Sequence, residues 1–207
     1  MDQEPRSRPM PGQPGAWLWP GVDREHSPVL AIGGRHGLDD WRRVVIAPRS
    51  AGYKLSEPSW FVAADRTIRV LLRDDGGSRR LFIVDSRDGG RTWAAPQPTN
   101  MPDAQSKFVA LDLGDGLVAL VSSPTRDQTK RKLLAVCVSA DGRVFDRVLK
   151  LRHDEQAKPR LPGMHKAAGF QYPNAIVADG RLWVVYSVNK EDIELSAVPV
   201  QALHAGR

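Results

Sequence analysis

Few residues in this sequence are of the types that most often carry chemistry. There is one cysteine, Cys137, which excludes an internal disulfide and a site with several cysteine ligands. The histidines lack the spacing of a metal site, so we expect no metal and no cofactor. Charge is more informative, because 30 Lys and Arg against 24 Asp and Glu give a net charge of +6. This excess suits an anionic partner, whether nucleic acid, membrane headgroups or a carboxylated sugar.

A polar segment with fixed spacing is Ser86-Arg-Asp-Gly-Gly-Arg-Thr-Trp93, which has the pattern Ser-x-Asp-x-Gly-x-Thr-Trp known as an Asp box. Its Ser and Asp can hydrogen-bond loop amides, its glycines can adopt positive φ, and its Trp can pack under the turn. A shorter copy, with Phe in place of Trp, is Ser139–Phe145. We interpret both as structural turns away from any active site; two ordinary Asp-Gly hairpins are the alternative.

Short apolar runs bounded by turn residues indicate the elements that must position any site. With 207 residues, 41% of them hydrophobic and 26% charged, the chain is globular and forms one domain or at most two small ones. The runs are rich in β-branched and aromatic residues, so we predict an all-β fold. None approaches the roughly 18 apolar residues of a membrane span. The predicted strands cover residues 28–32, 44–47, 67–72, 81–84, 117–121, 133–138 and 182–186.

The strands recur as units that begin near residues 61, 108 and 175. The first two starts lie 47 residues apart, which fits a four-stranded propeller blade of about 40–50 residues. A polar insertion, roughly 153–170, delays the third, and such a loop is a usual place for binding groups. We therefore predict a partial β-propeller over 28–207. Five prolines and three glycines in the first 21 residues predict a disordered or extended leader over 1–27.

From about Leu55 to Val200 the chain resembles the sialidase superfamily of Asp-box β-propeller glycosidases. The stretches that carry the resemblance are Glu57-Pro-Ser-Trp60 with Arg73 after it, Val121-Ser-Ser-Pro124 with Arg131 after it, Gly169-Phe-Gln-Tyr-Pro173, and Tyr186–Ile193. The resemblance implies that Tyr172 and Glu57 are catalytic and that Arg73 and Arg131 bind substrate. Successive separations of 16, 58 and 41 residues agree with the order of these groups in the family.

The implied chemistry explains these residue types. A carboxylate nucleophile would be repelled by the carboxylate of a sialic acid, so the family uses a tyrosine hydroxyl. Since a phenol needs a base, Glu57 would accept the proton of Tyr172. Arg73 and Arg131 would hold the sugar carboxylate by charge-assisted hydrogen bonds. Taken singly, each residue also has an ordinary structural explanation, such as a local pair of Arg73 with Asp74 or Asp75, a solvated basic turn at Arg131, or a half-buried aromatic at Tyr172.

The resemblance is incomplete. The family has an aspartate acid/base and a third arginine, usually within Arg-Ile-Pro, in early blades, and this sequence contains no Arg-Ile-Pro. It supplies three to four of six blades at about 50 residues each. The chain is then the C-terminal part of a longer protein, which we favour, or it assembles with another copy through open blade edges, or it is an inactive relative.

Two functions follow from these expectations. The first is a retaining exo-glycosidase that removes a terminal acidic sugar, sialic acid, from glycoconjugates; the second is a non-catalytic propeller that binds acidic glycans or a protein partner. We expect no nucleic-acid partner, because basic residues are scattered among turns without interleaved aromatics. The sequence as given has no apolar signal core, which indicates the cytoplasm, or a secreted or periplasmic location if a signal precedes it.

Overall fold

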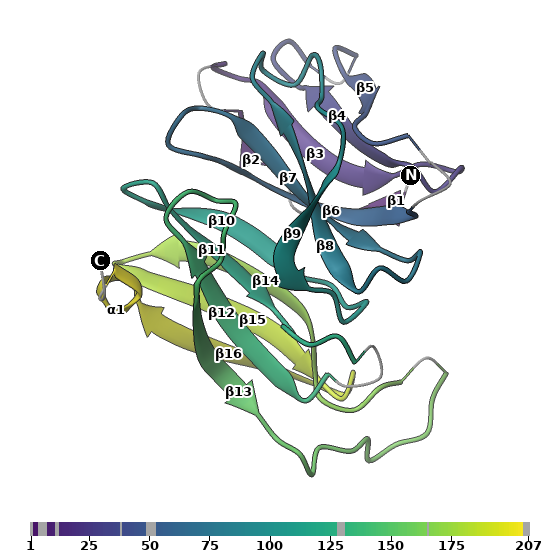
Figure 1. The fold of residues 1–207 in the computed structure, drawn as a ribbon, viewed down its shortest axis with the longest axis vertical. Coiled ribbons are helices and arrows are strands. Elements are labelled where there is room, and N and C mark those ends of the chain that lie inside the picture. Colours follow the sequence, from purple (N-terminus) through teal and green to yellow (C-terminus); the bar gives the residue numbers. More distant parts are fainter. Residues whose placement is uncertain are drawn as a thin grey trace. The chain divides into compact units, whose positions relative to one another are not determined.

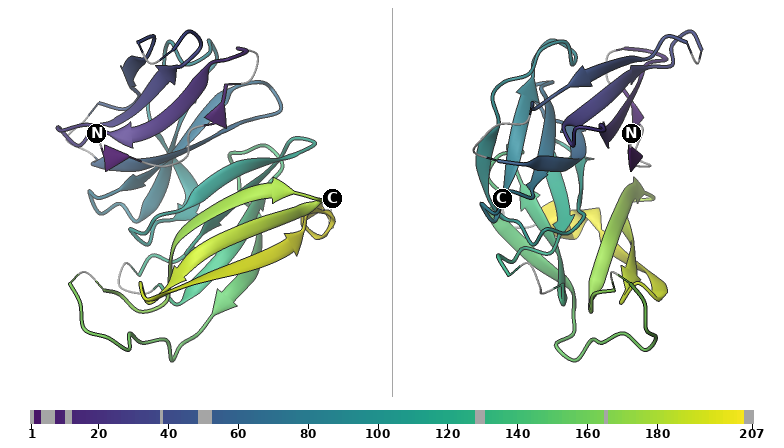
Figure 2. Two further views of the ribbon diagram at one scale, coloured as in Figure 1. Left: turned by 180° about the vertical axis from the view of Figure 1, so that it is seen from behind. Right: turned by 90° about the vertical axis from the view of Figure 1, so that its right-hand side faces the viewer.

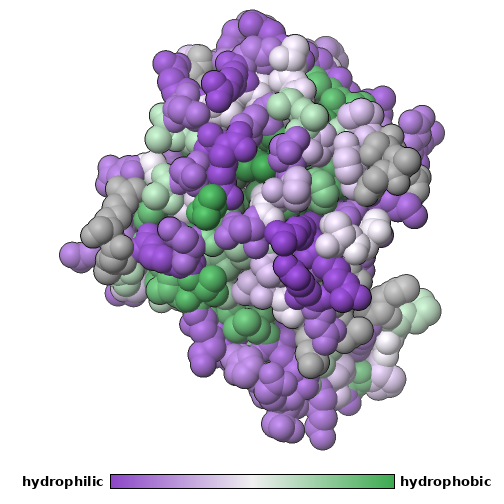
Figure 3. Space-filling model, in the orientation of Figure 1, coloured by the Kyte–Doolittle hydropathy of each residue, from purple (hydrophilic) through white to green (hydrophobic). Residues whose placement is uncertain are grey.

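The computed structural model describes residues 2–3, 8–10, 13–37, 39–48, 53–127, 131–164 and 166–204. Its described residues form sixteen strands and one short helix, so the predicted all-β fold is confirmed. The strands make four antiparallel sheets, and the chain divides into two compact units, residues 1–99 and 100–207 (Figure 1). Hydrophilic residues cover most of the face seen in Figure 3.

The first unit holds two sheets, and the last strand of the second sheet crosses the boundary after Thr99. One has the order β1-β3-β4-β5, with β2 also on β3, and the other has the order β6-β7-β8-β9. Leu18, Leu30, Val70 and Leu72 are fully buried in the core of this unit. The strands are β1 (Asp2–Gln3), β2 (Arg8–Pro9), β3 (Trp17–Val22), β4 (Pro28–Gly33), β5 (Arg42–Val45), β6 (Leu55–Val62), β7 (Ile68–Asp74), β8 (Arg80–Ser86) and β9 (Gln97–Pro102).

The second unit also holds two sheets, with the orders β10-β11-β12-β13 and β14-β15-β16. Strands β11 and β12 are buried on both faces almost throughout, as continuous apolar runs predict. Figure 2 shows these sheets from two further sides. The elements are β10 (Val109–Gly114), β11 (Leu117–Ser122), β12 (Leu133–Ser139), β13 (Arg147–His153), β14 (Phe170–Ala178), β15 (Arg181–Val188), β16 (Asp192–Pro199) and α1 (Val200–His204).

Part of the segment for which the sequence predicts a leader belongs to a sheet. Strand β3 pairs with β4 along its whole length, from Trp17 opposite Gly33 to Val22 opposite Pro28. The side chains of Met10, Ala16 and Leu18 are buried. Proline and glycine between these apolar residues hide the strand pattern from the sequence. The leader boundary at residue 27 stays a prediction, and residues 1, 4–7 and 11–12 lie outside the described residues.

Both Ser-x-Asp segments form turns closed by their own side chains. In the first, Ser86 Oγ donates to Asp88 Oδ1 at 2.9 Å and accepts from Gly90 N at 2.8 Å. The second repeats this arrangement with Ser139 Oγ, Asp141 Oδ1 at 2.9 Å and Gly142 N at 2.8 Å. In each turn the side-chain oxygens accept hydrogen bonds from backbone amides that have no backbone partner there. The turns are thereby held in one conformation between the third and fourth strands of their sheets.

Candidate functional site

Glu57 lies in a bulge near the start of β6. Pairing with β7 runs through Ser56 opposite Arg73 and resumes at Ser59 opposite Leu71, so Glu57 and Pro58 are passed over by the ladder. The φ of Glu57 is +49°, a left-handed conformation that costs a residue with a side chain about 1–3 kcal/mol. The bulge turns the carboxylate out of the regular alternation of the strand.

Arg73, at the end of β7, is held between two carboxylates. Its Nη1 donates to Glu57 Oε2 at 2.8 Å, and its Nε and Nη2 both lie 2.8 Å from Asp75 Oδ1. The second oxygen of Asp75 accepts from Ser56 Oγ at 2.7 Å. The side chains of Arg73 and Glu57 are mostly buried, 19% and 22% exposed. The structure therefore brings together two of the four site residues, and the local pair of Arg73 with Asp75 is present as well.

Arg131 in the second unit is fixed by hydrogen bonds to neighbouring segments. Its Nη1 donates to Gln171 Oε1 at 2.8 Å and its Nη2 to the carbonyl of Gln105 at 2.9 Å. Its own carbonyl accepts from Phe170 N at 2.7 Å, within a parallel bridge to Gly169. Gln171 is 1% exposed, so the amide that meets Arg131 is inside the protein. Arg131 is thereby tied to the residue that precedes Tyr172.

Gly169 is required where β14 begins. Its φ is +100°, and a Cβ added there would overlap the carbonyl group of Arg131 and lie 2.9 Å from Lys132 N. This obstacle is backbone, which a side-chain rotation cannot move. Only glycine allows the two segments that carry Arg131 and Tyr172 to lie this close.

Tyr172 lies in a second bulge of the same design. Pairing of β14 with β15 passes from Gln171 opposite Ser187 to Asn174 opposite Val185, so Tyr172 and Pro173 are skipped. Its φ is +52° and its side chain is 46% exposed. Lys190 Nζ lies 5.2 Å from the centre of the Tyr172 ring, within range of a cation–π contact.

Glu57 and Tyr172 therefore occupy equivalent places in two different sheets. Each follows a buried polar residue, precedes a proline, has a positive φ and lies in a two-residue bulge of the first strand of its sheet. Glu57 and Arg73 belong to the first unit, and Arg131 and Tyr172 to the second.

The turn between β15 and β16 holds the polar insertion in place. Glu191 accepts from the backbone N of Arg160 and Leu161 and from Lys166 Nζ, the last at 2.6 Å. The Arg160 amide, the Lys166 ammonium and the Leu161 amide lower the pKa of Glu191 to about 2, although burial acts in the opposite direction. Asn189 accepts from Gly169 N at 2.8 Å, which joins the same turn to the start of β14. In its described residues between 154 and 169 the insertion has no helix or strand, and these contacts fasten it to the β15–β16 turn and to the start of β14 (Figure 1).

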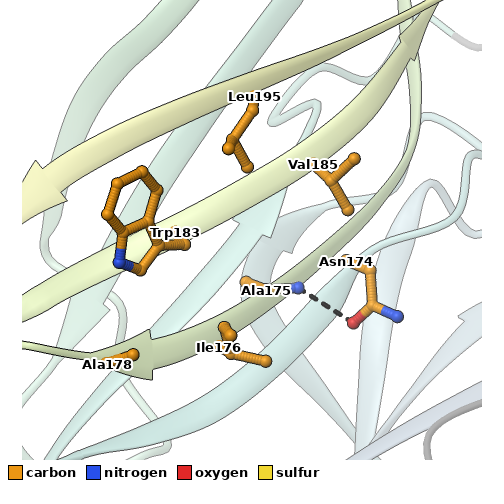
Figure 4. A pocket seen from close by; sticks show the side chains of 7 residues that line it. All are labelled: Asn174, Ala175, Ile176, Ala178, Trp183, Val185 and Leu195. Atoms are coloured by element: carbon orange, nitrogen blue, oxygen red, sulfur yellow. Dashed lines mark hydrogen bonds between the residues drawn. The ribbon is translucent and has the colours of Figure 1, made fainter.

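A separate pocket of about 420 Å³ lies on the outer face of the β14–β16 sheet (Figure 4). Its walls are mainly apolar, with Trp183, Val185 and Leu195 projecting from β15 and β16. Asn174 is the one polar residue of the lining, and its Oδ1 accepts from Ala175 N at 2.9 Å. Without a charged side chain, this pocket does not suit an acidic sugar.

Sequence reasoning missed several contributors to the site. Gln171 and Gln105 fix Arg131, and Lys190 lies over the candidate nucleophile, whereas Asp75, which fixes Arg73, was named from the sequence as a local partner. Gln171 and Lys190 lie inside the stretches that carry the family resemblance, so their position was a usable signal. Among the described residues, no group of three His, Cys, Asp or Glu side chains could hold a metal ion, and no helix is long and apolar enough to cross a membrane.

Four antiparallel sheets, two of them with a Ser-x-Asp turn, place the chain among the Asp-box β-propeller proteins. Within that class the chain belongs to the BNR repeat-like domain family, whose sequence profile matches residues 6–188. This match extends the resemblance, placed by sequence from about Leu55, to the N-terminal sheet. A comparison with curated proteins gave no match.

Solved structures with the same fold include sialidases. The chain is similar to the intramolecular trans-sialidase of Ruminococcus gnavus, solved with oseltamivir carboxylate, at a TM-score of 0.71 and 14% identity over 97% of this chain and 44% of that one. It is similar to the leech intramolecular trans-sialidase, solved with 2,7-anhydro-Neu5Ac, at 0.69 and 14% over 95% and 31%. It is also similar to the NanB sialidase of Streptococcus pneumoniae, at 0.64 and 16% over 92% and 29%. The fold is therefore a partial sialidase-type β-propeller, which spans less than half the length of these structures.

Proposed function

We propose that this chain contributes the tyrosine–glutamate part of a retaining exo-glycosidase site that removes a terminal sialic acid from glycoconjugates. Tyr172 is the nucleophile and Glu57 is the base that accepts its proton. Arg73 and Arg131 bind the sugar carboxylate. The observation that carries the proposal is the pair of equivalent bulges, which present a carboxylate and a phenol from the first strands of two sheets, each next to a fixed arginine.

The geometry of each part suits its role. Glu57 accepts a hydrogen bond from the Arg73 guanidinium, which holds its carboxylate in one orientation. Arg73 and Arg131 are both held by other groups before a ligand binds, so little side-chain entropy is lost on binding. Tyr172 is 46% exposed, so a sugar can approach this residue from solvent.

In the proposed reaction, the phenol oxygen of Tyr172 forms a bond to the anomeric carbon as its proton passes to Glu57. The bond to the aglycone oxygen breaks, and that oxygen takes a proton from an acid. Water then attacks the anomeric carbon and gives one proton back to the acid, while the bond to the tyrosine oxygen breaks and the proton returns from Glu57 to the phenol. The sialidase acid is an aspartate of early blades, to which we assign no residue of this chain.

The test is hydrolysis of a fluorogenic sialoside by the chain, or by a longer product of the same gene. Tyr172→Phe removes the nucleophile with little change in shape, and Glu57→Gln removes the base; each should lower turnover at least about 100-fold. Tyr53→Phe is a control for loss of a phenol elsewhere. Turnover by Tyr172→Phe at the wild-type rate would contradict the role assigned to Tyr172.

A second function is a non-catalytic module that binds acidic glycans or a protein partner. It is favoured by the absence of Arg-Ile-Pro from a chain whose net charge is +6. Calorimetric titration with sialyllactose distinguishes the two functions, since binding without hydrolysis supports the module and hydrolysis excludes it.

A further inference from the structure

A polar pocket of about 570 Å³ lies in the first unit, away from Glu57 and Arg73. It is formed where the β6–β7 hairpin and the Ser86–Trp93 turn meet the segment before β3 and the loop after β4. The residues that line it are Gln13, Arg35, Val62, Arg66, Ile68, Arg87, Asp88, Gly89 and Arg91.

The register of the sheet separates this pocket from the glycosidase site. Glu57 lies near the start of β6, whereas Val62 is its last residue. Across the ladder Val62 pairs with Ile68, and Ile68 pairs with Ser86 at the end of β8. From Ser59, where regular pairing resumes, three residues at about 3.3 Å each place the pocket roughly 10 Å further along the strand. The two sites are at opposite ends of one sheet.

The lining carries four guanidinium groups and one carboxylate. Arg35, Arg66, Arg87 and Arg91 have exposed side chains. Within the part of the chain that the structure describes, none of the four forms an ion pair with a carboxylate, and Arg35 donates its Nε to the carbonyl of Pro14 at 3.1 Å. Their charges are therefore not neutralised by direct contact inside the pocket.

The carboxylate of Asp88 is already occupied by the turn that contains it. Thr92 Oγ1 donates to Asp88 Oδ2 at 2.6 Å, and Ser86 Oγ and the backbone N of Arg91 and Thr92 also donate to it. These hydrogen bonds, those of Thr92 foremost, hold the pKa of Asp88 well below its usual value. Asp88 thus keeps its charge but has few oxygen lone pairs left for the arginines.

Asp65, in the β6–β7 hairpin, is the other carboxylate close enough to matter. Its burial raises its pKa, but hydrogen bonds from Thr67 and the charges of Arg69 and Arg87 outweigh this, so the pKa lies below the usual value. Asp65 forms its ion pair with Arg69, whose Nη2 lies 3.3 Å from Asp65 Oδ2, and not with Arg87. The pocket keeps an excess of positive charge.

We propose that this pocket is a second, non-catalytic site that binds a phosphate or sulfate group. Several guanidinium groups around one cavity match an anion with three or more acceptor oxygens better than a carboxylate, which offers two. The volume exceeds what an inorganic ion fills and lies in the range of small-ligand pockets, so a sugar that bears the anion fits as well. The side chains of Val62 and Ile68 offer an apolar wall to such a ring.

The experiment is calorimetric titration of the full chain at constant ionic strength in chloride. Sodium phosphate and sodium sulfate test for binding of the free anion. Galactose 6-phosphate and galactose 6-sulfate test for binding of the same group carried by a sugar. Saturable binding of at least one probe at one site per chain is expected. Arg66→Gln and Arg91→Gln should each weaken it about tenfold or more, because each removes charge-assisted hydrogen bonds to the anion.

Two control variants isolate the pocket. Arg143→Gln changes the arginine of the second Ser-x-Asp turn, outside the pocket, and should leave affinity unchanged. Glu57→Gln alters the proposed glycosidase site and should also leave it unchanged, so the two proposals fail separately. Absence of saturable binding with all four probes overturns the inference, as does wild-type affinity in Arg66→Gln and Arg91→Gln. Arg87→Glu, which reverses one charge on the surface, gives an independent variant if either substitution reduces folding.

Discussion

Gly169 offers the sharpest test of how the backbone positions the candidate site. We predict that Gly169→Ala lowers the free energy of unfolding by about 3 kcal/mol. The left-handed φ of +100° contributes about 1–2 kcal/mol. The overlap with the Arg131 carbonyl contributes the rest, because it must displace that group and break the hydrogen bond from Phe170 N, worth about 1 kcal/mol.

Gly180, in the turn between β14 and β15, is the matched control. Its φ is +68°, and a Cβ there would have no atom within 4 Å. Gly180→Ala therefore carries the conformational cost without the overlap, and we expect a loss of about 1 kcal/mol. Both substitutions restrict the unfolded chain by the same amount, so this effect cancels in the comparison.

Urea unfolding followed by far-UV circular dichroism measures both variants, with separate transitions fitted if the two units unfold independently. A difference of about 2 kcal/mol between them supports the close approach of the Gly169 and Arg131 segments. Equal destabilisation of the two variants would refute it, since only conformational strain would then be at work. Gly169→Ala should also weaken sialyllactose binding, because Arg131 loses its fixed position.

Three further predictions concern single side chains. Because the pKa of Glu191 is lowered to about 2, its ionised form stabilises the fold above about pH 4.5, and this stabilisation is lost as the pH falls toward 2. Glu191→Gln should therefore make the free energy of unfolding, measured in urea, depend less on pH in this range. Burial raises the pKa of the Cys137 thiol to about 12, so it should react with a thiol reagent only after unfolding; prompt reaction of the folded chain would contradict this. Ser86→Ala should cost about 1–2 kcal/mol in the same unfolding assay, because Gly90 N loses its buried acceptor, whereas Ser78→Ala at an exposed turn should cost less.

Strands buried on both faces were predictable from the sequence, because nothing interrupts their apolar character. Leu117–Val121 and Leu133–Val138 are examples, and each lies within an observed strand. Strand β13 was missed, since it alternates charged with apolar residues at the edge of its sheet. Strand β5 was placed two residues too late, because its first residues, Arg42 and Arg43, do not read as strand.

The candidate site residues could be chosen from the sequence, but their local geometry could not be predicted from it. Family resemblance selected Glu57 and Tyr172, yet a residue before proline is normally extended, so neither positive φ was foreseeable. The ties of Arg131 to Gln105 and Gln171 join residues 26 and 40 positions apart. Such long-range contacts depend on how strands are packed, which local patterns do not encode.

The repeated two-residue bulge separates chemistry from architecture. Ladder pairing resumes at Ser59 in one sheet and at Asn174 in the other, whatever side chain precedes the proline. A duplicated blade can thus exchange an acid for a phenol at this position without rebuilding the backbone ladder on either side of the bulge. A repeat protein can then diversify by one substitution per blade rather than by a new loop. The bulge position before the proline is also a natural place to introduce other reactive side chains.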